Sequence, residues 1–137
     1  MKLKDFDFRI WDKTKEAFLK QEPTLIKLDN ERVIAGRISR FYANTADIAD
    51  MFIGNGNDLE LELWSGICDK NRFRIYEGDI IECKAKIAGL YKKVRGSVIF
   101  KDRHFYVLVN KDIYKLNTLS NIKLLGNIHE NKELLNH

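Results

Sequence analysis

The sequence is poor in residues that build covalent or metal-bound scaffolds. Its 137 residues include two cysteines, one proline and three histidines. Cys68 and Cys83 form no Cys-x-x-Cys pair, so zinc binding and dithiol chemistry are not indicated and both thiols are expected to be free. The scattered histidines make no metal-binding cluster, and a single proline, Pro23, is not typical of a linker. We therefore expect no cofactor.

Long apolar runs are absent as well. No stretch approaches the roughly 20 residues that cross a bilayer, and the charged start, Met1 to Asp5, is not followed by the apolar segment of a secretory signal. A chain of this length with 45% hydrophobic residues can bury a core without disulfides or metals. We expect a cytoplasmic protein with no membrane partner.

The sequence does contain a series of short strand patterns. Leu59, Leu61 and Leu63 alternate with glutamates, which predicts a strand with one buried and one solvated face. Further strands, separated by turn residues, are predicted at 6–11, 25–28, 33–38, 73–76, 79–84, 94–100, 104–109 and 122–125. Helix is expected only over a short segment within 44–52 and in a last turn capped by Asn131. The prediction is a mostly β protein.

Positive charge is concentrated in the second half. Residues 1–64 hold 10 Lys/Arg against 12 Asp/Glu, whereas residues 65–137 hold 14 against 8. Within that half, a short stretch of seven basic residues is opposed only by Asp102: Lys84, Lys86, Lys92, Lys93, Arg95, Lys101 and Arg103. Lys84 and Lys86 share one face of a predicted strand, and Lys93 and Arg95 share one face of the next. With Tyr91 and Phe105 nearby, these residues are candidates for nucleic-acid binding.

Four short stretches, in order along the chain, form a set. FRIWD begins at Phe8, WSGICDKN at Trp64, IYEGDII at Ile75 and LGNIHENKELL at Leu125. They are similar to the patterns FRxWD, YTGLKDKN, IYEGDIV and IGNIYENPELL, and through them the chain resembles the YopX proteins of phages and prophages. The residues carried over by this resemblance are Arg9, Trp11, Asp12, Gly66, Asp69, Tyr76, Glu77, Gly78, Asp79, Gly126, Asn127, Glu130 and Asn131.

The resemblance implies one domain over 1–137, with an N-terminal hairpin or sheet region in 1–64 and a small SH3-like β-barrel in 65–137. It implies a phage or prophage origin and therefore the cytoplasm of a bacterial host. It supplies no substrate, cofactor or catalytic residue. Two positions depart from the pattern: Arg72 stands where the family has glycine, which suggests a rearranged loop, and Lys132 where it has proline.

Candidate catalytic groups are few. Glu77 and Asp79 lie two residues apart and could hold a divalent cation or act as an acid and base. The favoured interpretation is a turn at Glu77-Gly78, with Asp79 accepting hydrogen bonds from turn amides. The sequence from His129 begins like a zinc-protease helix, but Glu133 replaces the second histidine. An enzyme is not expected.

Two kinds of partner remain. The leading hypothesis is a non-enzymatic module that forms a homo-oligomer or binds a host or phage protein, through a sheet edge or an apolar patch. That patch would comprise Phe41, Tyr42, Met51, Phe52 and Ile53. The alternative is nucleic-acid binding by the basic strands over 84–103.

Overall fold

The structure, a computed structural model, describes Lys2 and residues 4–20, 24–28, 32–38, 52–53 and 58–136. Within these ranges the elements are strands and short 3-10 helices, with no α-helix. The strand pairs whose registers can be described are all antiparallel, and the content of strands confirms the mostly β prediction. No helix in the described part is long and apolar enough to span a membrane.

The chain forms two compact units that divide within one strand. One unit comprises Phe8–Glu62, and the other comprises Met1–Asp7 together with Leu63–His137. The boundary suggested by the sequence, between residues 64 and 65, lies close to this division. The first seven residues, however, belong with the second half of the chain.

The unit Phe8–Glu62 contains β1 (Phe8–Asp12), β2 (Ala17–Phe18) and the first part of β6 (Leu59–Cys68). A small core packs Ile10, Ala35 and Leu59 together. The solvated face predicted for β6 is wrong at Glu62, which is only 2% exposed. Its Oε1 pairs with Arg9 Nε at 2.9 Å, and this ion pair offsets the cost of burying the charge.

The same unit holds a sheet of order β3-β4-β5, with β3 at Thr24–Leu28, β4 at Val33–Ile38 and β5 at Phe52–Ile53. The helix predicted within 44–52 is wrong at its end, because Phe52 pairs with Ile38 of β4. Backbone pairing across the sheet overrides the local capping signal there. The rest of that helix lies outside the described residues, as do Phe41, Tyr42 and Met51 of the predicted patch.

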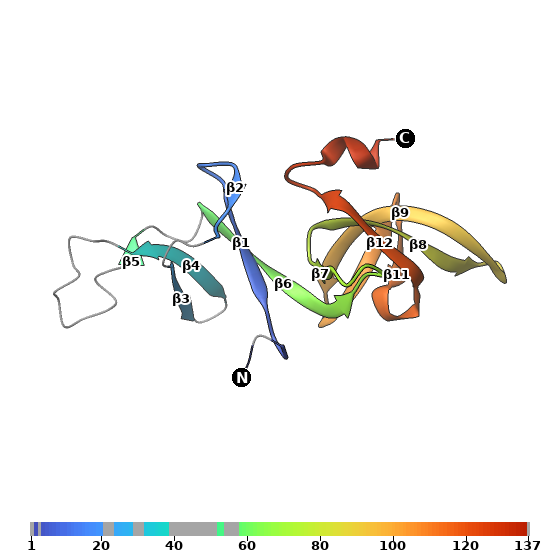
Figure 1. Cartoon of the computed structure of the whole chain (residues 1–137), viewed down its shortest axis with the longest axis horizontal. Helices are drawn as coiled ribbons and strands as arrows, with labels where there is room; N and C mark the ends of the chain where they lie inside the picture. Colours follow the sequence, from blue (N-terminus) through green and yellow to red (C-terminus); the bar gives the residue numbers. More distant parts are fainter. Residues whose placement is uncertain are drawn as a thin grey trace. The chain divides into compact units, whose positions relative to one another are not determined.

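The second unit is dominated by a five-stranded antiparallel sheet of order β11-β10-β9-β8-β12, which curls into a half-barrel (Figure 1). Its strands are β8 (Asp79–Ile87), β9 (Leu90–Lys101), β10 (His104–Val109), β11 (Asp112–Lys115) and β12 (Ser120–Asn127). The 3-10 helix η3 (Leu116–Thr118) joins β11 to β12. No register joins these two strands in the described part, so the pairings do not show a closed SH3-like barrel.

The inner face of the half-barrel carries the main core. Buried side chains from five strands and η3 pack together there: Ile75, Ile81, Cys83, Val98, Val107, Leu116 and Ile122. Ile75 comes from β7 (Arg74–Tyr76), which pairs with the second part of β6. The period-2 alternation in β8 and β10 places Ile81, Cys83 and Val107 on this face.

β8 and β9 extend well beyond their predicted limits. They continue to Ile87 and Leu90, which pair across a two-residue turn of Ala88 and Gly89. Both turn residues have positive φ, 53° and 81°. That combination matches the twist of a tight β-hairpin, so the strands stay paired up to the turn.

The final turn differs from the prediction. Lys132–Leu135 forms a single 3-10 turn, η4, and Asn131 makes no side-chain capping hydrogen bond to it. The Asn131 side chain is already engaged, because its Oδ1 accepts from the Asn127 amide at 3.2 Å. The predicted capping role of Asn131 is therefore wrong.

Candidate nucleic-acid interface

The basic face of the β8–β9 hairpin is set by its pairing register. Lys84 stands directly opposite Lys93, and Lys86 stands opposite Tyr91. Because side chains alternate along each strand, these four residues share one face, and all are exposed. Like charges opposed on a sheet are destabilising, so this arrangement carries a cost that a polyanion would relieve.

One carboxylate lies on this face. Glu82 is opposite Arg95, and its side chain lies 3.6 Å from Arg95 and 3.7 Å from Lys93. Glu82 thus offsets part of the charge at the base of the hairpin. Lys84 and Lys86 have no ion pair to any residue in the described part of the chain, so the hairpin remains positive toward its tip.

A pocket of about 170 Å³ opens beside the opposed lysines. Lys84 and Lys93 line it together with Lys70, Asn121, Glu82 and Cys83. Lys70 comes from the turn before β7, and its backbone amide donates to Ile122 O at 2.9 Å. Sequence reasoning missed Lys70, because only the tertiary fold places that turn beside the hairpin. Three lysines and one carboxylate, Glu82, line this pocket, so its lining is net positive.

The tip of the hairpin is apolar and exposed. Leu90 is 65% exposed and Tyr91 is 69% exposed. Tyr91 shares the face of the opposed lysines, so its ring can stack on a base while the lysines contact phosphates. Phe105, the other aromatic candidate, packs against the core and against the Phe100 ring at 4.8 Å. The sequence-based pairing of Tyr91 with Phe105 is therefore wrong.

The remaining basic candidates lie apart from the opposed lysines. Lys92 is opposite Ala85 and so points to the other side of the hairpin. Lys101 and Arg103 flank Asp102 at the far end of β9, where Asp102 and Arg103 form a turn with positive φ. The seven predicted residues thus divide into Lys84, Lys86, Lys93 and Arg95 on one face and three others elsewhere.

Asp69 anchors the D-K-N stretch of the family pattern. Its Oδ1 accepts from the amides of Asn71 and Phe73, both at 2.9 Å, and its Oδ2 accepts from Leu124 at 3.0 Å. Burial alone would raise the pKa of the Asp69 carboxyl, but these amide hydrogen bonds together hold it below its ordinary value of 3.8. Arg72 adopts φ of 70° within this turn, so the turn keeps a glycine-like conformation at a non-glycine residue.

Tyr76 belongs to a polar cluster with the N-terminal segment. Its hydroxyl donates to Asp7 Oδ2, which also pairs with Arg74 at 2.8 Å. The Arg74 guanidinium in turn lies 4.3 Å from the centre of the Trp64 ring. Partial burial and the bond to Asp7 raise the pKa of Tyr76 to about 12, so the phenol stays protonated and its hydrogen bond holds Asp7 to this unit.

Glu77 and Gly78 form the turn between β7 and β8, as the favoured interpretation predicts. Gly78 has φ of 88°, and Asp79, 1% exposed, accepts from the Tyr76 amide at 2.8 Å. The Glu77 carboxylate accepts from the Leu63 amide at 3.3 Å. Both carboxylates therefore hold backbone, and no group of three or more metal-ligating side chains occurs among the described residues.

The other motif residues also have structural roles: they bind nearby backbone groups or pack against neighbouring side chains. Arg9 pairs with Glu62 and lies over the Phe18 ring, which Trp11 contacts edge-on. Asp12 accepts from the Thr14 amide at 3.0 Å. Gly66 has φ of 83° within the irregular part of β6.

The last motif is a self-contained loop. The Asn127 side chain accepts from the amides of His129 and Glu130, both at 3.0 Å, and donates to Glu130 Oε1 at 3.4 Å. A side chain at Gly126 would bring its Cβ within 2.4 Å of Asn131 Oδ1. The glycine is required because the Asn131 side chain occupies that space.

The fold and these contacts define a small β-rich protein in which the motif residues stabilise turns and loops and pack against neighbouring side chains. The chain belongs to the YopX protein family, which matches residues 7–136. Its fold is similar to the crystal structure of protein EF1440 from Enterococcus faecalis, with a TM-score of 0.53 and 21% identity, over 95% of this chain and 97% of that chain. No curated protein matches the sequence.

Proposed function

We propose that the protein is a non-enzymatic binding module that uses the β8–β9 hairpin to bind single-stranded nucleic acid. The observation that carries this proposal is the opposed pair Lys84 and Lys93, with Lys86 and Tyr91 beside it on the same face. A row of lysines with an exposed aromatic ring beside it would supply phosphate contacts and base stacking together. We therefore rank nucleic-acid binding ahead of assembly, although assembly is the leading hypothesis from the sequence alone.

We also propose that the half-barrel is an SH3-like unit. Its support is the strand order, in which four strands form a meander and the fifth returns, after a 3-10 turn, beside the first. Small barrels of this kind present hairpins and loops as binding surfaces on a rigid sheet.

The test is binding of fluorescent single-stranded DNA and RNA, followed by anisotropy over a range of salt concentrations. If about four basic residues contact phosphates, the logarithm of affinity should fall with the logarithm of salt concentration with a slope of about −3. The double variant Lys84→Ala/Lys86→Ala should bind roughly tenfold more weakly, and the slope should become shallower by about 0.7 for each lysine removed.

Two further variants sharpen the test. Tyr91→Ala should weaken binding by about tenfold with no change of salt slope, because it removes stacking and not charge. Lys13→Ala removes an exposed lysine in the other unit and should leave affinity unchanged. No binding by the wild type, or equal loss in the Lys13 and Lys84/Lys86 variants, would refute the proposal.

A second candidate is association with another protein or with further copies of the chain. It is favoured by the large apolar side chains exposed on this unit, Phe73 at 58%, Phe100 at 44% and Ile113 at 44%. Ile113 lies on β11, the outermost strand of the sheet order. Light scattering tests this candidate: a fixed mass above 16.1 kDa that ignores salt and nucleic acid would support it, and a monomer would count against self-association.

A phage or prophage origin and a location in the bacterial cytoplasm complete the proposal. Both come from the family resemblance. The absence of enzymatic activity is supported by the engagement of the Glu77 and Asp79 carboxylates with backbone amides.

A further inference from the structure

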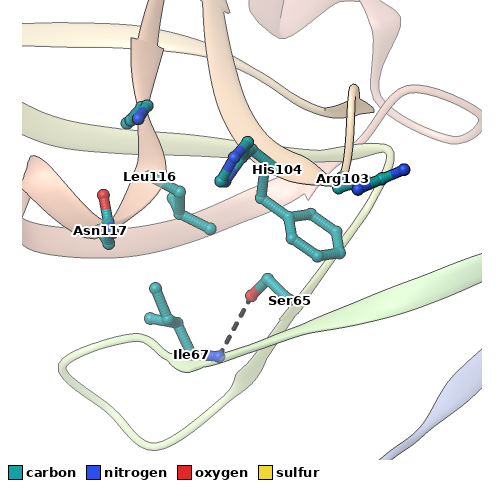
Figure 2. A pocket seen from close by; sticks show the side chains of 8 residues that line it. Ser65, Ile67, Arg103, His104, Leu116 and Asn117 are labelled. Atoms are coloured by element: carbon teal, nitrogen blue, oxygen red, sulfur yellow. Dashed lines mark hydrogen bonds between the residues drawn. The ribbon is translucent and has the colours of Figure 1, made fainter.

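A second pocket lies in the same unit, between the irregular part of β6 and the end of β11. It has a volume of about 170 Å³. Its apolar side is formed by Ile67, Phe105 and Leu116, and its polar lining residues are Ser65, Arg103, His104, Lys115 and Asn117. Figure 2 shows the Ile67 and Leu116 side chains pointing toward one another, with His104 on the Leu116 side and Ser65 on the Ile67 side.

Hydrogen bonds hold the walls of this pocket. On one side, Trp64 Nε1 donates to Ile67 O at 3.0 Å, and the Ile67 amide donates to Ser65 Oγ at 3.2 Å (Figure 2). On the other side, Thr118 Oγ1 donates to Lys115 O at 2.7 Å. Because these hydrogen bonds fix the backbone of both walls, the space is largely pre-formed, as ligand sites usually are.

The polar groups at the pocket have unused capacity. The Arg103, Lys115 and Asn117 side chains make no hydrogen bond or ion pair to residues in the described part of the chain. The Ser65 hydroxyl accepts one bond and still has its own proton to donate. No carboxylate lines the pocket, so an anionic ligand meets two cations and no opposing charge.

We propose that this pocket binds a single nucleotide. An apolar cavity of about 150 Å³ accommodates one six-membered ring, so the space beside Phe105 and Leu116 is matched to one base. Ser65 and Asn117 supply the donors and acceptor that read a base edge. Arg103 and Lys115, exposed at the rim, bind the phosphate. The nucleotide is either free or an unpaired unit of a nucleic-acid strand, and this proposal does not depend on the hairpin.

The test is a set of amide chemical-shift titrations of the whole chain. The ligands are the four ribonucleoside monophosphates, the matching nucleosides, inorganic phosphate and short single-stranded oligonucleotides. We expect saturable shifts at Ser65, Ile67, Phe105 and Leu116 with at least one monophosphate, or with an oligonucleotide alone if the strand is the source. Nucleosides and phosphate separately should bind much more weakly.

Single-residue variants test whether the ligand binds in this pocket. Lys115→Ala and Asn117→Ala change exposed side chains and should weaken binding, by about tenfold for Lys115, which supplies a charged hydrogen bond. Lys111→Ala, in the neighbouring turn, is the matched control and should have no effect. Lys84→Ala/Lys86→Ala should leave monophosphate affinity unchanged.

Three outcomes would overturn the proposal. They are no shift at the pocket with any ligand, equal shifts with phosphate alone, and loss of monophosphate binding in the Lys84/Lys86 variant. The last would place the nucleotide on the hairpin, whereas failure of the hairpin proposal alone would leave the pocket titration intact.

Discussion

Asp69 joins two segments that are 55 residues apart, because its Oδ2 accepts the Leu124 amide at 3.0 Å. The same carboxylate accepts two amides of its own turn through Oδ1. One side chain therefore shapes the turn before β7 and attaches that turn to β12. The turn also carries Lys70, so Asp69 indirectly positions one wall of the basic pocket.

Replacing Asp69 with Asn should destabilise the fold by about 2 kcal/mol. The asparagine side chain has one acceptor oxygen, whereas the three backbone N–H donors are bound by two carboxylate oxygens. The folded-state pKa of Asp69 lies below its ordinary value of 3.8. Its ionised form therefore contributes stability above about pH 4, and that contribution is lost as pH falls through the folded-state value. Urea denaturation at neutral and acidic pH measures this: the gap between wild type and Asp69→Asn should close in acid. A gap independent of pH would contradict the assignment.

Replacing Arg72 with Gly should stabilise the protein by about 0.5 to 1 kcal/mol. Arg72 has φ of 70°, and this left-handed conformation strains a non-glycine residue in the folded state. Glycine removes that strain, and the benefit is larger than the extra conformational entropy that glycine adds to the unfolded chain. Thermal denaturation tests this, with Lys70→Gly in the same turn as the control that should not stabilise. A lower midpoint for Arg72→Gly would show that the arginine side chain makes an additional stabilising contact.

The phenol of Tyr76 should ionise only at a higher pH than an ordinary tyrosine. Burial first, and then its hydrogen bond to Asp7, raise the pKa of Tyr76 to about 12. In an NMR titration of labelled tyrosines, Asp7→Asn should lower the pKa of Tyr76, and Asp5→Asn should leave it unchanged. No response to Asp7→Asn would mean that the N-terminal segment is not held by this contact in solution.

The two cysteines should differ sharply in reactivity. Cys68 is exposed and Cys83 is buried, and burial, with a smaller effect of the Glu82 charge, raises the pKa of Cys83 to about 11. An aromatic disulfide reagent at mildly alkaline pH should modify one thiol rapidly and the second only after unfolding. Cys68→Ser should abolish the rapid phase. Rapid modification of both thiols in the folded protein would contradict the burial of Cys83.

Local patterns were sufficient for much of the fold. The strands Val33–Ile38 and His104–Val109 have the bounds that the sequence predicts, and Glu77-Gly78 forms the expected turn. These features depend on residues that are close together in the chain, so they can be predicted from the sequence alone. Asn131 and Phe52 show the limit, since in both cases a partner in the fold overrode the local preference.

The sequence by itself determined the mostly β architecture, the family motifs and the concentration of basic residues. Only the tertiary structure decided which charges meet. It brings Lys70 beside Lys84 and Lys93, directs Lys92 to the other face, and buries Glu62 against Arg9. The physical reason is that alternation assigns a residue to a face of its strand, whereas strand register and long-range packing determine what stands opposite it.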